Sequence, residues 1–122
     1  MAATINRKPF KKEFNLEKRK ETATRILRLH PDRIPVIVEK DKGGSLLQIK
    51  KNKYLVPNDL TLSRFAYEIR NYISIPSDTA LFLFVNEHAM PAGQVSLGEL
   101  YKQHKNEDGF LYITYSGENT FG

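Results

Sequence analysis

The side chains that could carry out chemistry are few in this sequence, and none of them falls into a catalytic spacing. Cysteine is absent, which excludes thiol nucleophiles, thiolate metal sites and disulfides. The three histidines, His30, His88 and His104, are too far apart in the sequence to suggest a metal site. Ser63 and Ser74 have no base at a spacing typical of an activated nucleophile, and the acidic residues form no catalytic pair. We therefore expect a protein that is not an enzyme and that holds neither a metal nor a cofactor.

Positive charge is concentrated at the amino-terminal end of the chain. Through Arg33 there are ten Lys and Arg against four Asp and Glu, a net of +6, whereas the remainder carries nine against ten, so that the whole chain has +5. Such a cluster attracts polyanions, which leaves nucleic acid, anionic lipid and an acidic protein as alternative partners. A solvated helix face rich in lysine explains the same pattern without any partner.

The length and hydropathy favour one soluble domain. The chain has 122 residues, 40% of them hydrophobic and 27% charged, and single domains usually run to about 100–200 residues. The longest apolar run covers residues 80–85, far below the ~20 residues that span a bilayer. Residues 1–8 lack the apolar stretch of a signal peptide, and the signals for myristoylation and prenylation are missing. We expect an intracellular protein of the cytoplasm.

The amino-terminal half predicts one long helix followed by two strands. Asn15 can cap a helix in which Ala23 and Ile26 fall at helical spacing, and Pro31 should end it near residue 30. A shorter helix or turn is expected over residues 9–13. Residues 34–38 and 53–56 have the composition of strands, and the turn formers at 41–45 would allow the two to pair. Pro35 indicates an edge or a strand start, where a missing N–H costs no ladder bond.

The carboxyl-terminal half predicts two more helices and two more strands. Residues 62–73 repeat apolar side chains at helical spacing, and the apolar run 80–85 is typical of a strand buried on both faces. Ser96 and Glu99 have the spacing of a capping box, which starts a helix to about residue 105. Asp108 and Gly109 then turn the chain into a strand over 110–115. The order predicts an α+β domain with its helices on one side of a mixed sheet.

Several long motifs resemble one known family. The segments 31–40 (PDRIPVIVEK), 53–57 (KYLVP), 81–86 (LFLFVN), 108–112 (DGFLY) and 117–122 (GENTFG) are similar, in this order, to the autophagy ubiquitin-like modifier family. That family includes the GABA-receptor-associated protein and the light chain of the microtubule-associated proteins. The resemblance covers roughly residues 16–122. It implies a ubiquitin-like β-grasp, with a four-stranded mixed sheet and helices, plus two amino-terminal helices.

The resemblance also implies a division of the chain and a conjugation reaction. Residues 1–31 would be a basic helical extension, 32–116 the ubiquitin-like domain, and 117–122 a flexible tail for conjugation. Proteins of this family are activated at a terminal glycine, here Gly122, by an ATP-using activating enzyme. A conjugating enzyme then joins the glycine to phosphatidylethanolamine on the autophagosome membrane, and a cysteine protease processes and deconjugates the modifier. Glycine suits this role because it has no Cβ to hinder attack at its carboxyl carbon.

The second site implied by the resemblance is a groove along residues 53–56 for cargo receptors with aromatic-x-x-aliphatic motifs. Such a peptide would add a strand to this edge and insert its two anchors in pockets on either side. The pocket for the aromatic anchor maps to Ile26, Pro35, Lys53, Leu55 and Phe110. The pocket for the aliphatic anchor maps to Tyr54, Val56, Pro57, Leu60, Phe65 and Ile69. Arg33, Lys51 and Lys53 would attract acidic residues that flank the motif. For Phe65 and Ile69, simple core packing is the stronger alternative.

One alternative function remains open beside the modifier. A basic interaction module that binds microtubules, through acidic tubulin segments, or RNA would use the amino-terminal positive charge. Aromatic residues for base stacking are not interleaved with that charge. A tubulin or RNA interaction is therefore expected as a secondary activity.

Overall fold

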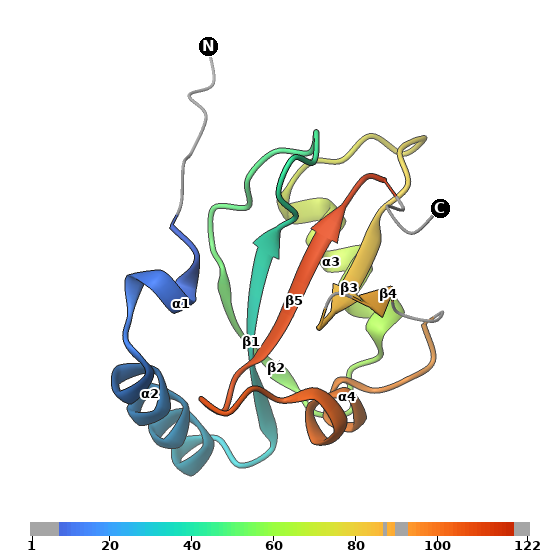
Figure 1. Cartoon of the computed structure of the whole chain (residues 1–122). Coiled ribbons are helices and arrows are strands. Elements are labelled where there is room, and N and C mark those ends of the chain that lie inside the picture. The colour runs from blue at the N-terminus through green and yellow to red at the C-terminus, as the bar shows by residue number, and fades with distance from the viewer. Residues whose placement is uncertain (1–7, 87, 90–92, 119–122) are drawn as a thin grey trace.

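The computed structural model of the chain describes residues 8–86, 88–89 and 93–118, which form one mixed sheet covered by helices on both faces (Figure 1). The sheet has the strand order β2-β1-β5-β3-β4. The elements follow along the chain as α1 (Phe10–Glu13), α2 (Leu16–Leu29), β1 (Arg33–Lys40), β2 (Lys53–Pro57), α3 (Leu62–Tyr72), β3 (Phe82–Val85), β4 (His88–Ala89), α4 (Leu97–His104) and β5 (Leu111–Ser116).

The central strands β1 and β5 lie parallel, and every other pairing in the sheet is antiparallel. The amide of Val38 donates to Asn52 O at 2.7 Å, so alternate amides of β1 point toward the β2 side. By the same alternation the nitrogen of Pro35 points toward β5, one residue before Val36, where the pairing with β5 begins. The missing N–H of Pro35 therefore breaks no ladder bond, as predicted for a strand start.

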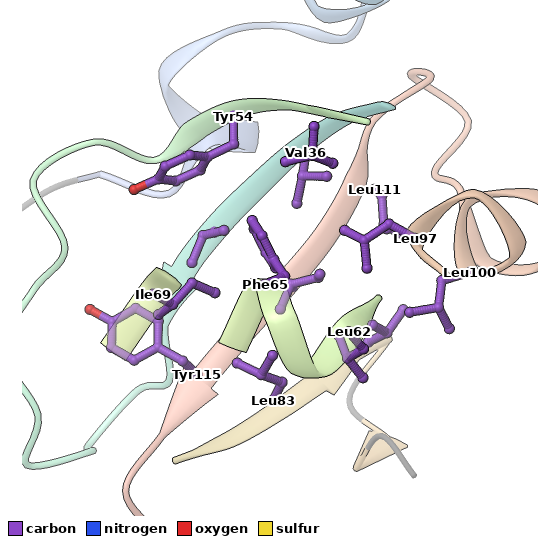
Figure 2. Packing of buried hydrophobic residues seen from close by; sticks show 14 of the residues in the cluster. Val36, Tyr54, Leu62, Phe65, Ile69, Leu83, Leu97, Leu100, Leu111 and Tyr115 are labelled. Carbon is purple, nitrogen blue, oxygen red and sulfur yellow. The ribbon is translucent and has the colours of Figure 1, made fainter. Parts of the chain in front are cut away.

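The main core lies between α3 and one face of the sheet. Phe65 and Ile69 of α3 are 1% and 0% exposed and lie against Val36 and Tyr115 of the strands (Figure 2). The Tyr115 hydroxyl donates to Leu47 O at 2.6 Å and accepts from the Ile49 amide at 2.7 Å. One core side chain thereby fixes the path of the loop between β1 and β2.

A second apolar cluster joins α1 and α2 to the opposite face of the sheet. It consists of Phe10, Ala23, Ile37 and Phe110, and the Phe10 amide donates to the carboxylate of Glu39 at 2.8 Å. Our expectation that all helices lie on one side of the sheet is therefore wrong. The reason is that β1 has apolar side chains on both faces, and each of these faces must be shielded from water.

The helix boundaries follow their caps. The side chains of Asn15 and Ser96 accept from the backbone amides of Lys18 and Glu99, at 2.9 and 3.1 Å, which confirms the two predicted starts. The α2 helix ends at Leu29, just before Pro31. None of the described helices is both long and apolar enough to cross a bilayer.

The β-grasp with two amino-terminal helices is confirmed, with one addition to the sheet. Residues 86–91 carry no strand pattern in the sequence, yet His88 pairs with Val85 and Ala89 with Phe84 to give the two-residue strand β4. This strand extends the predicted four-stranded sheet by one short member at its edge.

Candidate functional site

The strand β2 forms one edge of the sheet, and the only described strand with which it pairs is β1. An edge strand presents a row of backbone amides and carbonyls to any extended segment that comes alongside it. At the other edge, β4 has only two residues and offers a much shorter template. The topology therefore makes β2 the better edge for adding a strand.

Side chains along β2 alternate between exposed and buried positions. Lys53 and Leu55 are exposed, whereas Tyr54 and Val56 are buried. Leu55 lies opposite Pro35 and is 38% exposed, which is high for an aliphatic side chain within a sheet. Its face of the sheet is the one covered by α1 and α2, while Tyr54 and Val56 belong to the core under α3.

The residues predicted for the aromatic anchor gather on the α2 face of the sheet. Phe110 is fully buried there, and Ile26 of α2 is half-buried against the same cluster. Pro35 is buried in β1 beside Leu55. Pro35 thus lies beside Leu55, and Phe110 comes just before the β5 residue that pairs with Val36, on the far side of β1 from β2.

The residues predicted for the aliphatic anchor lie on the α3 face and are more deeply buried. Phe65 and Ile69 belong to the fully buried core, so an incoming side chain could reach them only if the side chains above them moved. Val56 is buried in the same core, Leu60 packs against it, and Pro57 is half-buried at the end of β2. These six positions, Tyr54 included, surround the same part of the sheet edge, and their contact with a peptide stays a prediction.

Sequence reasoning missed Tyr72, which lies against Tyr54 near the start of β2. Its ring centroid lies 5.7 Å from that of Tyr54, and the ring centroid of Phe65 lies 6.0 Å from that of Tyr54. Tyr72 is 62% exposed. The signal was present in the sequence, because Tyr72 lies seven residues after Phe65, two helical turns along the same side of α3.

Cations lie at both ends of β2. Lys51 and Lys53 are exposed where the strand begins, and Lys51 Nζ is 5.2 Å from the centroid of the Tyr54 ring. Arg33 is exposed opposite Pro57, where the strand ends. The three predicted cations therefore border the strand and remain accessible to acidic groups.

A buried carboxylate attaches α2 to the start of β5. Asp108 accepts from Arg19 Nη1 at 2.6 Å, from the Tyr112 hydroxyl at 2.5 Å and from the Phe110 amide at 2.8 Å. Burial, together with the hydrogen bond to Asp108, raises the pKa of Tyr112, and burial raises the pKa of Tyr101. Because Asp108 binds both Arg19 and the Phe110 amide, it joins α2 to the start of β5 beside Phe110, one of the residues predicted for the aromatic anchor.

The residue predicted as the point of conjugation lies beyond the part of the chain that the structure describes. The last strand ends at Ser116, whose hydroxyl accepts from the Glu118 amide at 3.0 Å. Gly122, predicted as the point of conjugation, falls within residues 119–122 and so outside the described residues. Nor do the described side chains include any group of three or more His, Asp or Glu that could hold a metal ion.

Comparison with known proteins identifies the family. Residues 18–122 match the family described as "Autophagy protein Atg8 ubiquitin like". The chain belongs to the Atg8 family. Its fold matches the crystal structure of Atg8 from Trypanosoma brucei with a TM-score of 0.86 and 35% identity, over 96% of this chain and 100% of that one.

Relatives from fungi and plants match nearly the whole of this Atg8-family chain. Autophagy-related protein 8 of Mycosarcoma maydis is 51% identical over 116 residues, which cover 95% of this chain and 98% of that protein. The protein of the same name from Schizosaccharomyces pombe is 50% identical over 95% of both chains. Autophagy-related protein 8e of Arabidopsis thaliana is 51% identical over 93% of this chain and 92% of its own. The chain is thus a ubiquitin-like protein of autophagy, as the sequence motifs predicted.

Proposed function

We propose that this chain is a modifier conjugated through Gly122 to phosphatidylethanolamine during autophagosome formation. The family match supports this, because it runs to residue 122 and includes the tail. Phosphatidylethanolamine brings two acyl chains, each contributing ~0.8 kcal/mol per buried CH₂, and two chains generally suffice for stable anchoring. The chain would be the substrate of activating and conjugating enzymes and of a cysteine protease, not a catalyst. It would move from the cytoplasm to the autophagosome membrane.

The proposal also assigns cargo-receptor binding to the edge of β2. The observation that carries it is the exposed Leu55 between the buried Tyr54 and Val56 on an edge strand. A peptide paired here would gain backbone hydrogen bonds from the edge and selectivity from its aromatic and aliphatic anchors. Lys51, Lys53 and Arg33 would favour peptides with acidic flanks.

Reconstitution tests the conjugation. The protein is incubated with activating and conjugating enzymes, ATP and liposomes that contain phosphatidylethanolamine. We expect a lipid-dependent mobility shift and a gain of the lipid's mass in wild type. Deletion of Gly122 should abolish both changes, and Leu55→Ala, as a matched control away from the tail, should retain them. Full lipidation of the deletion variant would overturn the assignment.

Titration with paired peptides tests the groove. An aromatic-x-x-aliphatic peptide is compared with the same peptide carrying alanine at both anchors, while backbone NMR signals are followed. We expect binding of the first peptide only, with the largest signal changes over residues 53–57. Changes confined to β4 or α4 would mean that the peptide uses another surface.

A second candidate function, binding of a polyanion such as RNA or an acidic tubulin segment, has one specific observation in its favour. Lys8, Lys11, Lys12, Lys18, Lys20, Arg25 and Arg28 are all exposed on the helical extension. Salt separates the two functions, because binding to a polyanion weakens steeply with ionic strength. Charge reversal of Lys11 and Lys12 should weaken such binding and leave conjugation through Gly122 intact.

A further inference from the structure

One flank of α3 faces the edge strand β2. Phe65 and Tyr72 both contact the Tyr54 ring, so they define the side of the helix that turns toward β2. Glu68 lies three residues after Phe65 and four before Tyr72, and such spacings bring side chains together on one helix surface. Glu68 is therefore the acidic residue of α3 that borders the proposed groove.

Glu68 and Tyr72 are both accessible on this flank. The Glu68 side chain is 40% exposed, and Tyr72 is more exposed still. The single ion pair of Glu68 within the described parts of the chain is with Arg64 Nε, at 3.9 Å between two exposed groups. At that distance and exposure the pair contributes little, so the carboxylate remains free to accept from another cation.

We propose that Glu68 and Tyr72 form a subsite for a basic side chain, preferably arginine, of a peptide paired with β2. The inference rests on the proposed peptide groove. A strand added to β2 lies about 4.8 Å farther out, and its alternate side chains point to the α3 face beside Tyr54 and Val56. A guanidinium there can donate two hydrogen bonds to the Glu68 carboxylate. The exposed face of the Tyr72 ring offers a cation–π contact to the same group.

Two cations lie close to the proposed subsite. Arg64 precedes it by one turn of α3, and Lys51 approaches the Tyr54 ring from the start of β2. Lys53, on the α2 face of β2, favours acidic peptide residues, whereas Glu68, on the α3 face, repels an acidic side chain and attracts a basic one. Lys51 reaches the same Tyr54 ring as Tyr72 and partly offsets this attraction. Opposite charges on the two faces of the edge thus select which peptide side chains point toward α3.

The test is a scan of arginine through each non-anchor position of an aromatic-x-x-aliphatic peptide, with glutamine at the same position as the reference. Affinities are measured by calorimetry for wild type, Glu68→Gln, Glu68→Lys and Glu107→Gln. At one position we expect arginine to bind about 3- to 10-fold more tightly than glutamine, the combined effect of an exposed ion pair and a cation–π contact. Glu107 is exposed in the turn before β5, so its variant is the matched control and should keep the full advantage.

The variants separate the two parts of the subsite. Glu68→Gln should remove most of the arginine advantage, and Glu68→Lys should reverse it, so that the glutamine peptide binds more tightly than the arginine peptide. Tyr72→Leu should reduce it in part, and Arg64→Gln should increase it slightly by removing a neighbouring cation that repels arginine. The advantage should also shrink at high ionic strength.

Two negative results have different meanings. If peptides bind but the arginine advantage is absent, or persists unchanged in Glu68→Gln, the subsite is wrong while the groove stands. If no peptide with both anchors binds wild type, the groove itself is wrong, and the subsite with it.

Discussion

At the scale of single residues, Leu55 and Tyr112 lie on the same face of the sheet but differ in exposure, so we expect Leu55 to serve recognition and Tyr112 to serve stability. Leu55 is partly exposed at the edge, whereas Tyr112 is half-buried nearer the centre and donates to Asp108. Truncating Leu55 at the edge should therefore change ligand affinity more than the free energy of unfolding. Ionising Tyr112 nearer the centre should instead lower the free energy of unfolding.

Truncation of Leu55 should weaken peptide binding and leave the fold intact. Leu55→Ala removes an apolar contact that a peptide anchor would cover, so we expect a loss of about 1–3 kcal/mol in binding free energy. Calorimetry with several aromatic-x-x-aliphatic peptides measures the loss, and thermal unfolding checks the fold. Tyr67→Ala is the control, because Tyr67 is exposed on α3, five residues before Tyr72 and not on the flank that contacts β2. Equal affinities for Leu55→Ala and wild type would remove Leu55 from the groove.

Tyr112 should make the free energy of unfolding fall in alkaline solution. Its pKa is raised in the folded state by burial and by its hydrogen bond to Asp108. Below the ordinary tyrosine pKa of about 10 the stabilisation is complete, because both states are protonated. At higher pH the unfolded chain releases this proton while the folded chain retains it, and the stabilisation declines.

Denaturant titrations between about pH 8 and about pH 11 check this expectation. Tyr112→Phe should be less stable than wild type at neutral pH and should lose less stability above about pH 10. Part of the alkaline decline should remain in the variant, because the pKa of Tyr101 is also raised by burial. Identical slopes for the two proteins would assign the whole decline to other groups.

At the scale of elements, the position of α2 depends on the turn before β5. Gly109 has a φ of +92°, a conformation that favours glycine. A Cβ placed there would lie 2.8 Å from the Cβ of Ala23. Arg19 and Asp108 join the same two elements. Close packing and a buried ion pair thus fix α2 against the sheet.

Substitution of Gly109 should loosen this attachment. Gly109→Ala places a side chain at a φ that L residues rarely adopt and brings its Cβ too close to Ala23. We expect it to lower the free energy of unfolding by about 1–3 kcal/mol. Combining it with Ala23→Gly removes the clash and leaves the strain, so the double variant should lose less than the sum of the two single ones. Chemical denaturation of the four proteins gives this coupling. Strict additivity would show that the two residues do not touch in solution.

The elements differ in how well the sequence predicts them. Asn15, Ser96 and the proline after α2 act locally, so the helix limits are readable from nearby residues. The pairing of His88 with Val85 cannot be predicted from nearby residues, because a strand of two residues has no periodicity. The Arg19–Asp108 bond joins residues 89 positions apart, and no spacing rule indicates such a contact. The groove residues came from the family resemblance. Which of them are exposed depends on the packing of α3 over one face of β2, which no local pattern contains.

At the scale of the whole molecule, the proposed groove and the start of the tail belong to different strands of the sheet. The proposed groove follows β2 at one edge, whereas the tail continues from β5, which is separated from β2 by β1. This arrangement would let an anchored protein still present its groove, as a link between membrane and cargo requires.

The two sites should therefore act independently. Deletion of Gly122 should leave peptide affinity in solution unchanged, and Leu55→Ala should leave the lipidated fraction nearly unchanged. Liposomes carrying the conjugated protein should capture peptide with the affinity measured in solution, at equal amounts of accessible protein. A large loss of capture on conjugation would mean that the tail or the bilayer covers the groove.

The central position of β5 has a consequence for the synthesis of the chain. Because β5 lies between β1 and β3, the sheet cannot close until the ribosome has passed residue 116. Until then the local β1–β2 and β3–β4 pairs and isolated helices can form, but the apolar side chains of both faces of β1 lack their central neighbour. Pairing between strands so distant in sequence is slow compared with local contacts. We therefore expect the nascent chain to expose the apolar side chains of β1 until the final strand inserts, a state that is prone to aggregation.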